Sequence, residues 1–557
     1  MFSLTPSQPF NLAPQADTSH RPSWITKKQL SKGLLAAVML FMLPTQSLMA
    51  QTIDSLAREP SSRASGSLPA LGDNLELSAA AERRIGDRIA SSIYRDTDFI
   101  DDPILGDYVQ SIWQPLLAVA RLRGELNAEL DERFSWELFL LRDRSINAFA
   151  LPGGYFGIHL GLISSVSNSD ELAAVLGHEL SHVTQRHISR LITQQSRQTP
   201  WLIGAMILGA LAASKSPQVA SAAMAGGQAV AAQTQLNFSR DMEREADRVG
   251  FGVMTDAGFN SRGVGSMFEK LQQASRLNDN GSFPYLRSHP LTTQRIAEAQ
   301  ARLQMAQQTG AGVNAVSDEI STKARVFHAM MAARARVLSE PGVDALRAMV
   351  AQAQLQNRPA DTASSKITAA GVWYAGALAA AKFRNFSAAR TFTEKLNNLA
   401  VDNTQARRVV ELLSLEVDLL AGTPSPAAAH INLANTTQRA ELLLQARTLI
   451  AVGRAHEVDE RLLTWVTAHP KDAVAWQLLA VAYGNQGQNV RAIRADAEGR
   501  AAQLDYSAAL DRLRAAQTIM QSKPGSTDYI EGSIIDTRAR QMDLLVKEQT
   551  LQDKLNH

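Results

Sequence analysis

The chain has 557 residues, enough for about three or four domains at roughly 150 residues each, so it is not a single small binding module. Its 56 Lys and Arg nearly balance 54 Asp and Glu, and the resulting net charge of +2 argues against a nucleic-acid-binding domain. The absence of cysteine excludes disulfides, thiol catalysis and thiolate metal sites. A metal ion in this protein would therefore need His, Asp or Glu ligands.

The first 50 residues (1–50) predict a secretory signal peptide. Lysines precede an apolar run from Gly33 to Leu43, and a small residue, Ala50, follows it. The run is too short for a bilayer core, which needs about 20 residues, so cleavage after Ala50 is favoured over an uncleaved anchor. Residues 51–76 are rich in Ser, Gly, Pro and Ala and are typical of a linker.

The segment 77–310 predicts an α+β domain that is mainly helical with a small sheet. Isoleucine recurs at every fourth residue after Ser78, which predicts a helix, and an acidic pair before Pro103 predicts the start of a second one. WELFLL (136–141) and YFGIHLGLI (155–163) carry aromatic and branched residues between turn residues. We expect both to form strands.

The motif HELSH, within ELAAVLGHELSHVTQRH, indicates a metal site. On a helix, His178 and His182 lie about one turn apart, so both imidazoles project from one face and can bind the same ion. Glu179 between them is suited to be the general base that deprotonates the attacking water. A solvated helix with two surface histidines is the alternative. The apolar residues beside the motif favour a buried helix, where unpaired histidines are costly.

A catalytic zinc site generally has three protein ligands, and a second helix can supply the third. The segment SRDMEREADRVG (239–250) predicts such a helix, in which Glu243 can ligate and Asp247 can accept a hydrogen bond from a ligating imidazole. By spacing, Glu245 competes for the ligand position, and an acidic helix face without metal is a further alternative. His187 lies roughly 500° around the helix from the second histidine and is expected to point elsewhere.

HELSH is preceded by NAFALPGGYFGIHLGLI and followed by SRDMEREADRVG and SHPLTTQRI. In this order the four motifs, within residues 78–300, resemble the HtpX/CAAX-prenyl-protease family of zinc metallopeptidases. The resemblance implies a zincin-type fold with one zinc ion per chain and Glu243 as the third ligand. It also implies transition-state-stabilising roles for His289 and Arg295. GGYFGIHL resembles the edge strand that aligns the substrate backbone.

Two features leave alternatives open. His289 can occupy the fourth metal position in a resting state, because a secreted protease among unfolded clients needs restraint, or it is a loop histidine beside a rigid proline. WLIGAMILGALAA (201–213) is too short to span a membrane and predicts a buried helix, a lid over the groove or a membrane-touching hairpin.

The identity of the metal is also open, because a site of two imidazoles and one carboxylate would accept cobalt or manganese as well as zinc.

Residues 320–557 are rich in Ala, Leu, Arg and Gln and predict an all-α tetratricopeptide-repeat array. The best match is a repeat that starts at 473 and contains Trp476, with weaker matches starting at 439 and 370. A generic Ala-rich helical bundle is the alternative. Stacked helix pairs form a concave surface that typically binds peptides or proteins.

Together with the signal peptide and the helical array, the resemblance implies a periplasmic zinc endopeptidase of a Gram-negative bacterium that acts in quality control or assembly of outer-membrane proteins. The resemblance implies unfolded or misassembled outer-membrane proteins as substrates and docking of the array on the outer-membrane assembly machinery. We expect no nucleic-acid partner and at most peripheral membrane contact. One alternative is a chaperone or adaptor that binds clients through its repeats with a mostly latent protease site. Another is an interaction protein peripheral to the membrane.

Overall fold

The computed structural model describes residues 77–195, 239–276, 284–309, 318–339, 342–356, 359–422, 431–522 and 528–556. The predicted signal peptide, the linker and the apolar segment 201–213 lie outside these ranges. Within them, the structure contains no helix of the length and apolarity that membrane crossing demands.

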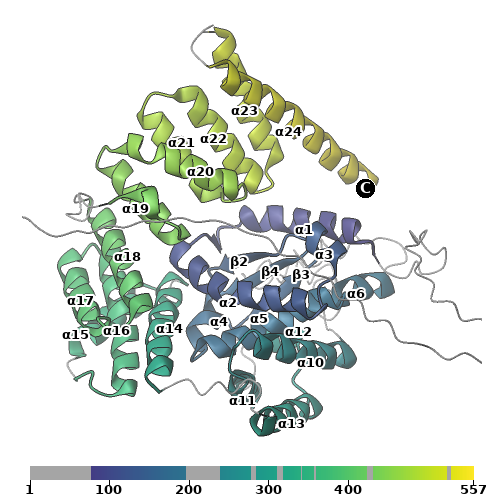
Figure 1. Ribbon diagram of the computed structural model, residues 1–557, viewed down its shortest axis with the longest axis vertical. Helices are drawn as coiled ribbons and strands as arrows, with labels where there is room; N and C mark the ends of the chain where they lie inside the picture. The colour runs from purple at the N-terminus through teal and green to yellow at the C-terminus, as the bar shows by residue number, and fades with distance from the viewer. Residues whose placement is uncertain are drawn as a thin grey trace, which may run out of the picture. The chain divides into compact units, whose positions relative to one another are not determined.

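The first half of the chain combines helices with one small sheet, which confirms the expected mainly helical α+β class (Figure 1). The elements are α1 (Ala79–Tyr94), β1 (Phe99–Ile100), α2 (Pro103–Leu122), α3 (Ala128–Arg133), β2 (Glu137–Leu141), β3 (Ala148–Leu151), β4 (Tyr155–His159), α4 (Leu160–Ser165), α5 (Ser169–Thr184), α6 (His187–Gln195), α10 (Arg240–Asp256), α11 (Arg262–Arg276), α12 (Tyr285–Ser288) and α13 (Thr293–Thr309).

The starts of the first two long helices follow from capping. The Ser78 side chain accepts a hydrogen bond from the Ala81 amide and so caps α1. Asp102 caps α2 by accepting from the Leu105 amide at 2.8 Å, and Pro103 occupies the first helical position. A proline there is favourable because its missing N–H would have no partner within the helix. Both predicted helices are therefore confirmed.

The sheet has the strand order β1-β2-β4-β3, in which β2 and β4 run parallel and the outer pairs run antiparallel. The expectation that GGYFGIHL forms the edge strand is wrong, because β4 is paired on both sides. All five residues of β4 are buried, as befits an interior strand, whereas β3 has two half-buried residues and lies at the edge.

The strand expected over 155–163 is also too long. It ends at His159, and the following Leu160 begins the buried helix α4. A short apolar run does not distinguish a buried strand from a buried helix, which explains the difference.

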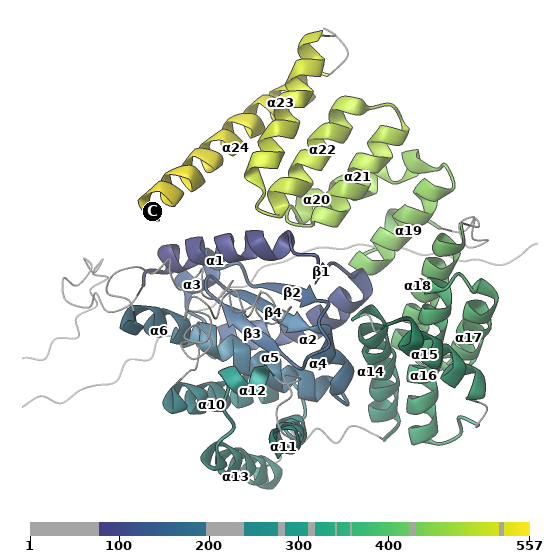
Figure 2. The same cartoon turned by 180° about the vertical axis from the view of Figure 1, so that it is seen from behind.

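The second half of the chain is helical. Its helices are α14 (Asp318–Leu338), α15 (Val343–Leu355), α16 (Ala363–Lys382), α17 (Phe386–Leu399), α18 (Thr404–Ala421), α19 (Arg439–Ala451), α20 (Asp459–Ala468), α21 (Ala473–Asn485), α22 (Asn489–Ala502), α23 (Tyr506–Ser522) and α24 (Tyr529–Asn556). Figure 2 shows α21 to α24 as neighbours side by side in chain order. Helices begin at 439 and 473, where repeats were predicted to start, but the repeat type stays a prediction.

One hydrophobic core extends from Ala79 in α1 to Leu444 in α19. Ion pairs also connect the two halves of the chain, because the buried Arg334 of α14 binds Asp102 at the start of α2 and Glu416 of α18. Helices α14 and α19 therefore pack directly on the sheet-containing half.

Candidate metal centre

Helix α5 presents the motif residues toward the protein interior. Its N-terminus is capped by Asn168, whose side chain accepts a hydrogen bond from the Glu171 amide at 3.0 Å. His178, Glu179 and His182 are all buried, although they are polar. Burial of three such groups on one helix requires partners, which α10 and His289, directly after α12, provide.

Four side chains converge at this place. The candidate ligand atoms of His178, His182, Glu243 and His289 all lie within 4.8 Å of one another. The Nε2 atoms of His178 and His182 are 3.0 Å apart, and the Glu243 carboxylate is 3.4 Å from each of them. Nδ1 of His289 is 3.0 Å from Glu243 and 3.3 Å from Nε2 of His178. The structure thus brings together the three predicted ligands and the histidine expected at a fourth position.

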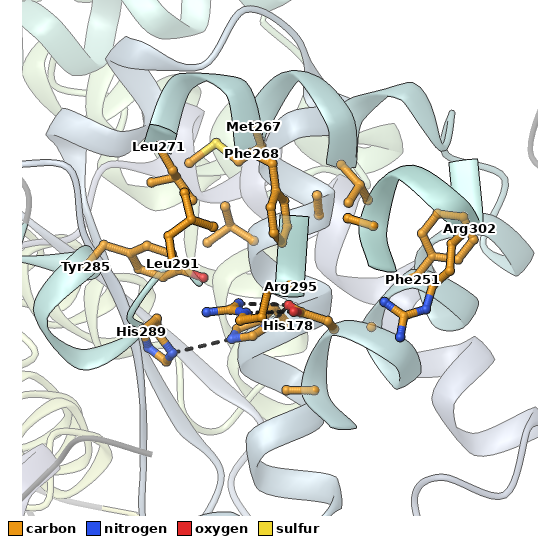
Figure 3. Close-up of a pocket in the computed structure, with 17 residues that line it drawn as sticks. His178, Phe251, Met267, Phe268, Leu271, Tyr285, His289, Leu291, Arg295 and Arg302 are labelled. Atoms are coloured by element: carbon orange, nitrogen blue, oxygen red, sulfur yellow. Dashed lines mark hydrogen bonds and ion pairs between the residues drawn. The ribbon is translucent and has the colours of Figure 1, made fainter. Parts of the chain in front are cut away.

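The outer side of His178 faces a carboxylate. Its Nδ1 lies 3.0 Å from Asp247, and Arg295 holds the same carboxylate through two hydrogen bonds of 2.7 and 2.8 Å. A third guanidinium nitrogen of Arg295 lies 2.6 Å from Glu243. Figure 3 shows Arg295 beside His178 and a dashed line that joins the His178 ring to His289. Arg295 therefore binds both acidic residues that face the histidines.

His187 and Glu245 occupy places that the sequence did not predict. His187 does not belong to the cluster of four, but its Nδ1 is 2.9 Å from Nδ1 of His182, so the expectation that it points elsewhere is wrong. Helix α5 ends at Thr184, and Arg186 has a left-handed φ of 58°, which turns the chain back. The expectation assumed a continued helix, and no glycine or proline in the sequence marks this turn. Glu245, the competing ligand candidate, instead lies 3.0 Å from Nε2 of His187.

The hydrogen bonds in this cluster fit a bound cation. Asp247 can only accept, so Nδ1 of His178 carries the proton that it donates. Glu245 likewise accepts from Nε2 of His187, which leaves Nδ1 of His187 to accept from His182. When both rings are neutral, as metal ligands must be, the two facing Nε2 atoms of the motif histidines present lone pairs, 3.0 Å apart, next to the Glu243 carboxylate. Converging lone pairs and a buried carboxylate are the donor set of a divalent metal such as zinc.

The pKa shifts indicate a strongly negative environment. Burial lowers the pKa of His178, but hydrogen bonds with Asp247 and Glu243 outweigh it and raise that pKa to about 10. Burial alone would raise the pKa of the Asp247 carboxyl, whereas Arg295 and His178 hold it at about 2. The carboxylates that favour a positive charge on His178 would favour a metal cation in the same way.

Glu179 has a different environment from the other acids. Burial raises the pKa of its carboxyl above the usual range, and the opposing contributions from His289, His178 and the Ala150 amide of β3 are smaller. Its Oε1 lies 3.4 Å from Nε2 of His289. Glu179 therefore sits beside the cluster without belonging to it, as a proton acceptor requires.

An apolar pocket adjoins the cluster. Its wall includes Met267, Phe268 and Leu271 of α11 and Leu291, and His178 and His289 line it at one end (Figure 3). The ring of Tyr285 also lines the pocket and stacks on His289 with 4.6 Å between centroids. The pocket offers an apolar side chain a place next to the histidines.

Comparison with known proteins adds independent findings. Residues 108–303 match peptidase family M48. The putative beta-barrel assembly-enhancing protease of Vibrio cholerae is 34% identical over 217 residues, which are 39% of this chain and 43% of that protein. The beta-barrel assembly-enhancing protease of Yersinia pestis is 29% identical over 442 residues, 78% of this chain and 84% of that protein. The Escherichia coli protein of the same name is 31% identical over 277 residues, 49% of this chain.

The coverage of these relatives differs. The chain spans 43% of the length of the Vibrio cholerae protein and 53% of the Escherichia coli protein in these matches. The family match ends at residue 303, so it covers the metal cluster but none of the helices from α14 onward.

Proposed function

We propose that the protein is a zinc-dependent endopeptidase acting in quality control or assembly of outer-membrane proteins. The premise is the match of residues 108–303 to peptidase family M48, which confirms the expected metalloendopeptidase. The observation that carries the proposal is the convergence of His178, His182 and Glu243 beside the buried carboxylate of Glu179. The names of the assembly-enhancing relatives support the outer-membrane part.

We assign zinc to His178, His182 and Glu243, one ion per chain. When bound, zinc would polarise the scissile carbonyl and acidify the attacking water. Glu179 takes the proton from that water on a carboxylate oxygen and passes it to the leaving amine. A raised pKa suits this role, because it makes the Glu179 carboxylate a stronger base for the proton of the attacking water.

We place His289 as the cap of the resting site. Its contacts with Glu243, His178 and Glu179 put it where a substrate carbonyl would have to lie. Substrate entry then requires His289 to leave, and its ring is free to stabilise the transition state from a new position. Arg295 contributes by holding Asp247 and Glu243 in place.

The substrate chain is proposed to pair with the edge strand β3. Helix α5 packs against β3, and the Ala150 amide of that strand acts on the Glu179 carboxyl, so the edge passes beside the base. An extended peptide that adds to a sheet edge gains main-chain hydrogen bonds, and neighbouring pockets select side chains. The apolar pocket lined by Leu271 and Leu291 suits a large apolar residue of the substrate.

We further propose the domain organisation predicted from the sequence: a signal peptide (1–50), a linker (51–76), a metallopeptidase domain (77–310) and a tetratricopeptide-like array (320–557). A signal peptide would place the enzyme in the periplasm. The array would bind the outer-membrane assembly machinery or its clients. Helices that start at 439 and 473 support this assignment.

A direct test incubates the zinc-loaded chain with an outer-membrane β-barrel protein, either unfolded or folded in detergent micelles. We expect cleavage of the unfolded form, and binding without cleavage by Glu179→Gln. If neither form is cut although zinc is bound, the endopeptidase proposal fails and the chaperone or adaptor alternative replaces it. A Glu179→Gln chain that restored the cellular function would also favour that alternative.

A further inference from the structure

We propose that His187 and Glu245 are positioning residues that hold the metal ligand His182 through a relay of two hydrogen bonds. The inference rests on the proposed function, since it needs a metal at His182. Nδ1 of His182 meets Nδ1 of His187 at 2.9 Å, and Nε2 of His187 meets Glu245 at 3.0 Å.

The turn after α5 brings His187 into place. Arg186 adopts a φ of 58°, a conformation that costs a residue with a side chain of the order of 1 kcal/mol. Its guanidinium is held by the buried Glu82 at 2.9 Å and by the Leu77 carbonyl. These contacts stabilise the reversal, and the first residue of α6 then lies against His182 instead of on the opposite side of a continued helix.

The protons in the relay have one consistent arrangement. A carboxylate only accepts, so His187 donates to Glu245 from Nε2 and accepts at Nδ1. His182 must then donate from its own Nδ1, and its Nε2 keeps a lone pair directed at the cluster. The relay thereby fixes both the tautomer and the ring orientation that a metal ligand needs.

The two motif histidines are supported differently. His178 donates directly to the buried Asp247, whereas His182 reaches its carboxylate through one intervening imidazole. Glu245 is 35% exposed and is also bound by Arg190, so the relay ends at the protein surface. A substitution at Glu245 therefore alters the support of His182 without opening a cavity in the core.

The experiment measures zinc affinity by competition with a chromogenic chelator, on the full chain. His187→Leu, which cannot accept a hydrogen bond, and Glu245→Gln, which removes the terminal charge, should each weaken affinity by about 10- to 100-fold. His187→Asn, whose amide oxygen can accept from His182, should recover a substantial part of the loss.

Two further readouts distinguish positioning from general destabilisation. The visible spectrum of the cobalt-substituted chain should change in His187→Leu, because the geometry at His182 changes, and return toward wild type in His187→Asn. Matched controls are His328→Leu, a buried histidine far from the cluster in sequence and bonded to Tyr108, and Asp241→Asn, an exposed acid of α10. Both controls should keep wild-type affinity and spectrum.

The outcomes are separable from those of the proposed function. A wild-type chain that binds no zinc contradicts the proposed function itself. A wild-type chain that binds zinc, with unchanged affinity and cobalt spectrum in Glu245→Gln and His187→Leu, overturns the relay alone. If His187→Leu does not fold, Glu245→Gln decides. An equal loss of affinity in Asp241→Asn would also overturn the relay, because the effect would then be a general one of charge on α10.

Discussion

Gly177 of α5 and Gly250 of α10 meet backbone to backbone, immediately before the first ligand histidine. A Cβ atom on Gly250 would lie 2.9 Å from the carbonyl carbon of Gly177 and 2.9 Å from the amide nitrogen of His178. Real Cβ atoms do not approach that closely, so only glycine permits this crossing. The short distance between the helices is what brings Glu243 and Asp247 of α10 within reach of the histidines of α5.

Gly250→Ala should therefore weaken zinc binding and lower stability. Alanine alone would favour a helix interior by about 1 kcal/mol over glycine, so a loss of stability reports the clash between α5 and α10. Zinc titration and thermal unfolding check this. Gly484→Ala is the control, because a Cβ there meets no atom within 4 Å, and it should be neutral or stabilising. A Gly250→Ala chain as stable and as tightly zinc-bound as wild type would contradict the account.

His289→Ala should raise basal casein cleavage several-fold, because it removes the ring that lies within 3.3 Å of His178 and caps the site. The substitution should leave one zinc ion bound, since His178, His182 and Glu243 remain. His456→Ala, a change at an exposed histidine, serves as the control and should have no effect. A loss of turnover with zinc retained would contradict the cap and leave His289 with the transition-state role alone.

Removing the buried charge of Arg334 is expected to lower the free energy of unfolding far more than removing an exposed charge. It is buried and binds Asp102 and Glu416, so Arg334→Met leaves two carboxylates without their cation and should cost about 3–5 kcal/mol. Chemical unfolding measures the difference. Arg347→Met removes an exposed ion pair and should change stability by less than about 1 kcal/mol. Equal small effects of the two substitutions would show that the buried contacts do not join α2 to α14 as described.

Stability should fall on mild acidification, in part through His328. Burial lowers the pKa of this histidine, which is neutral in the fold, where Nδ1 faces the Tyr108 hydroxyl and Nε2 the Val166 carbonyl. The unfolded chain takes up a proton below about pH 6.5, whereas the folded chain does so only at lower pH. The free energy of unfolding therefore decreases as pH falls from about 6.5 toward the lower pKa that His328 has in the fold. The decrease is at most about 1.4 kcal/mol per pH unit.

The check compares wild type with His328→Leu across pH 7 to 5. The variant has lost two hydrogen bonds and starts less stable, but its curve should fall less steeply on acidification, so the difference between the chains narrows. Parallel curves over this range would mean that His328 does not titrate with folding.

Local signals in the sequence were sufficient for α1 and α2 and for the two helices, α5 and α10, that carry most of the site. The caps at Ser78 and Asp102, the motif on α5 and the acidic face of α10 each depend on residues within a few positions of one another. The candidate ligands could be predicted for the same reason, since helical spacing places His178 and His182 on one face.

Features that depend on tertiary packing were not predictable. The edge position of β3 follows from pairing between strands, and β1 has only two residues, too few for a periodic pattern. The contact of His187 with His182 depends on the left-handed Arg186, which Glu82 holds from α1, far away in the sequence. The binding of Arg334 to Asp102 spans 232 residues and has no local signature.

The central claim is that zinc is held by His178, His182 and Glu243 while Glu179 acts as the base. The measurement that tests it most directly is zinc content together with casein cleavage for wild type, Glu179→Gln and Glu243→Ala. The account predicts about one zinc ion per wild-type chain, as for a three-ligand catalytic site, retention of zinc with turnover reduced by about 10²- to 10⁴-fold in Glu179→Gln, and loss of zinc in Glu243→Ala. Equal zinc content in all three chains would contradict Glu243 as a ligand, and unchanged cleavage by Glu179→Gln would contradict the base.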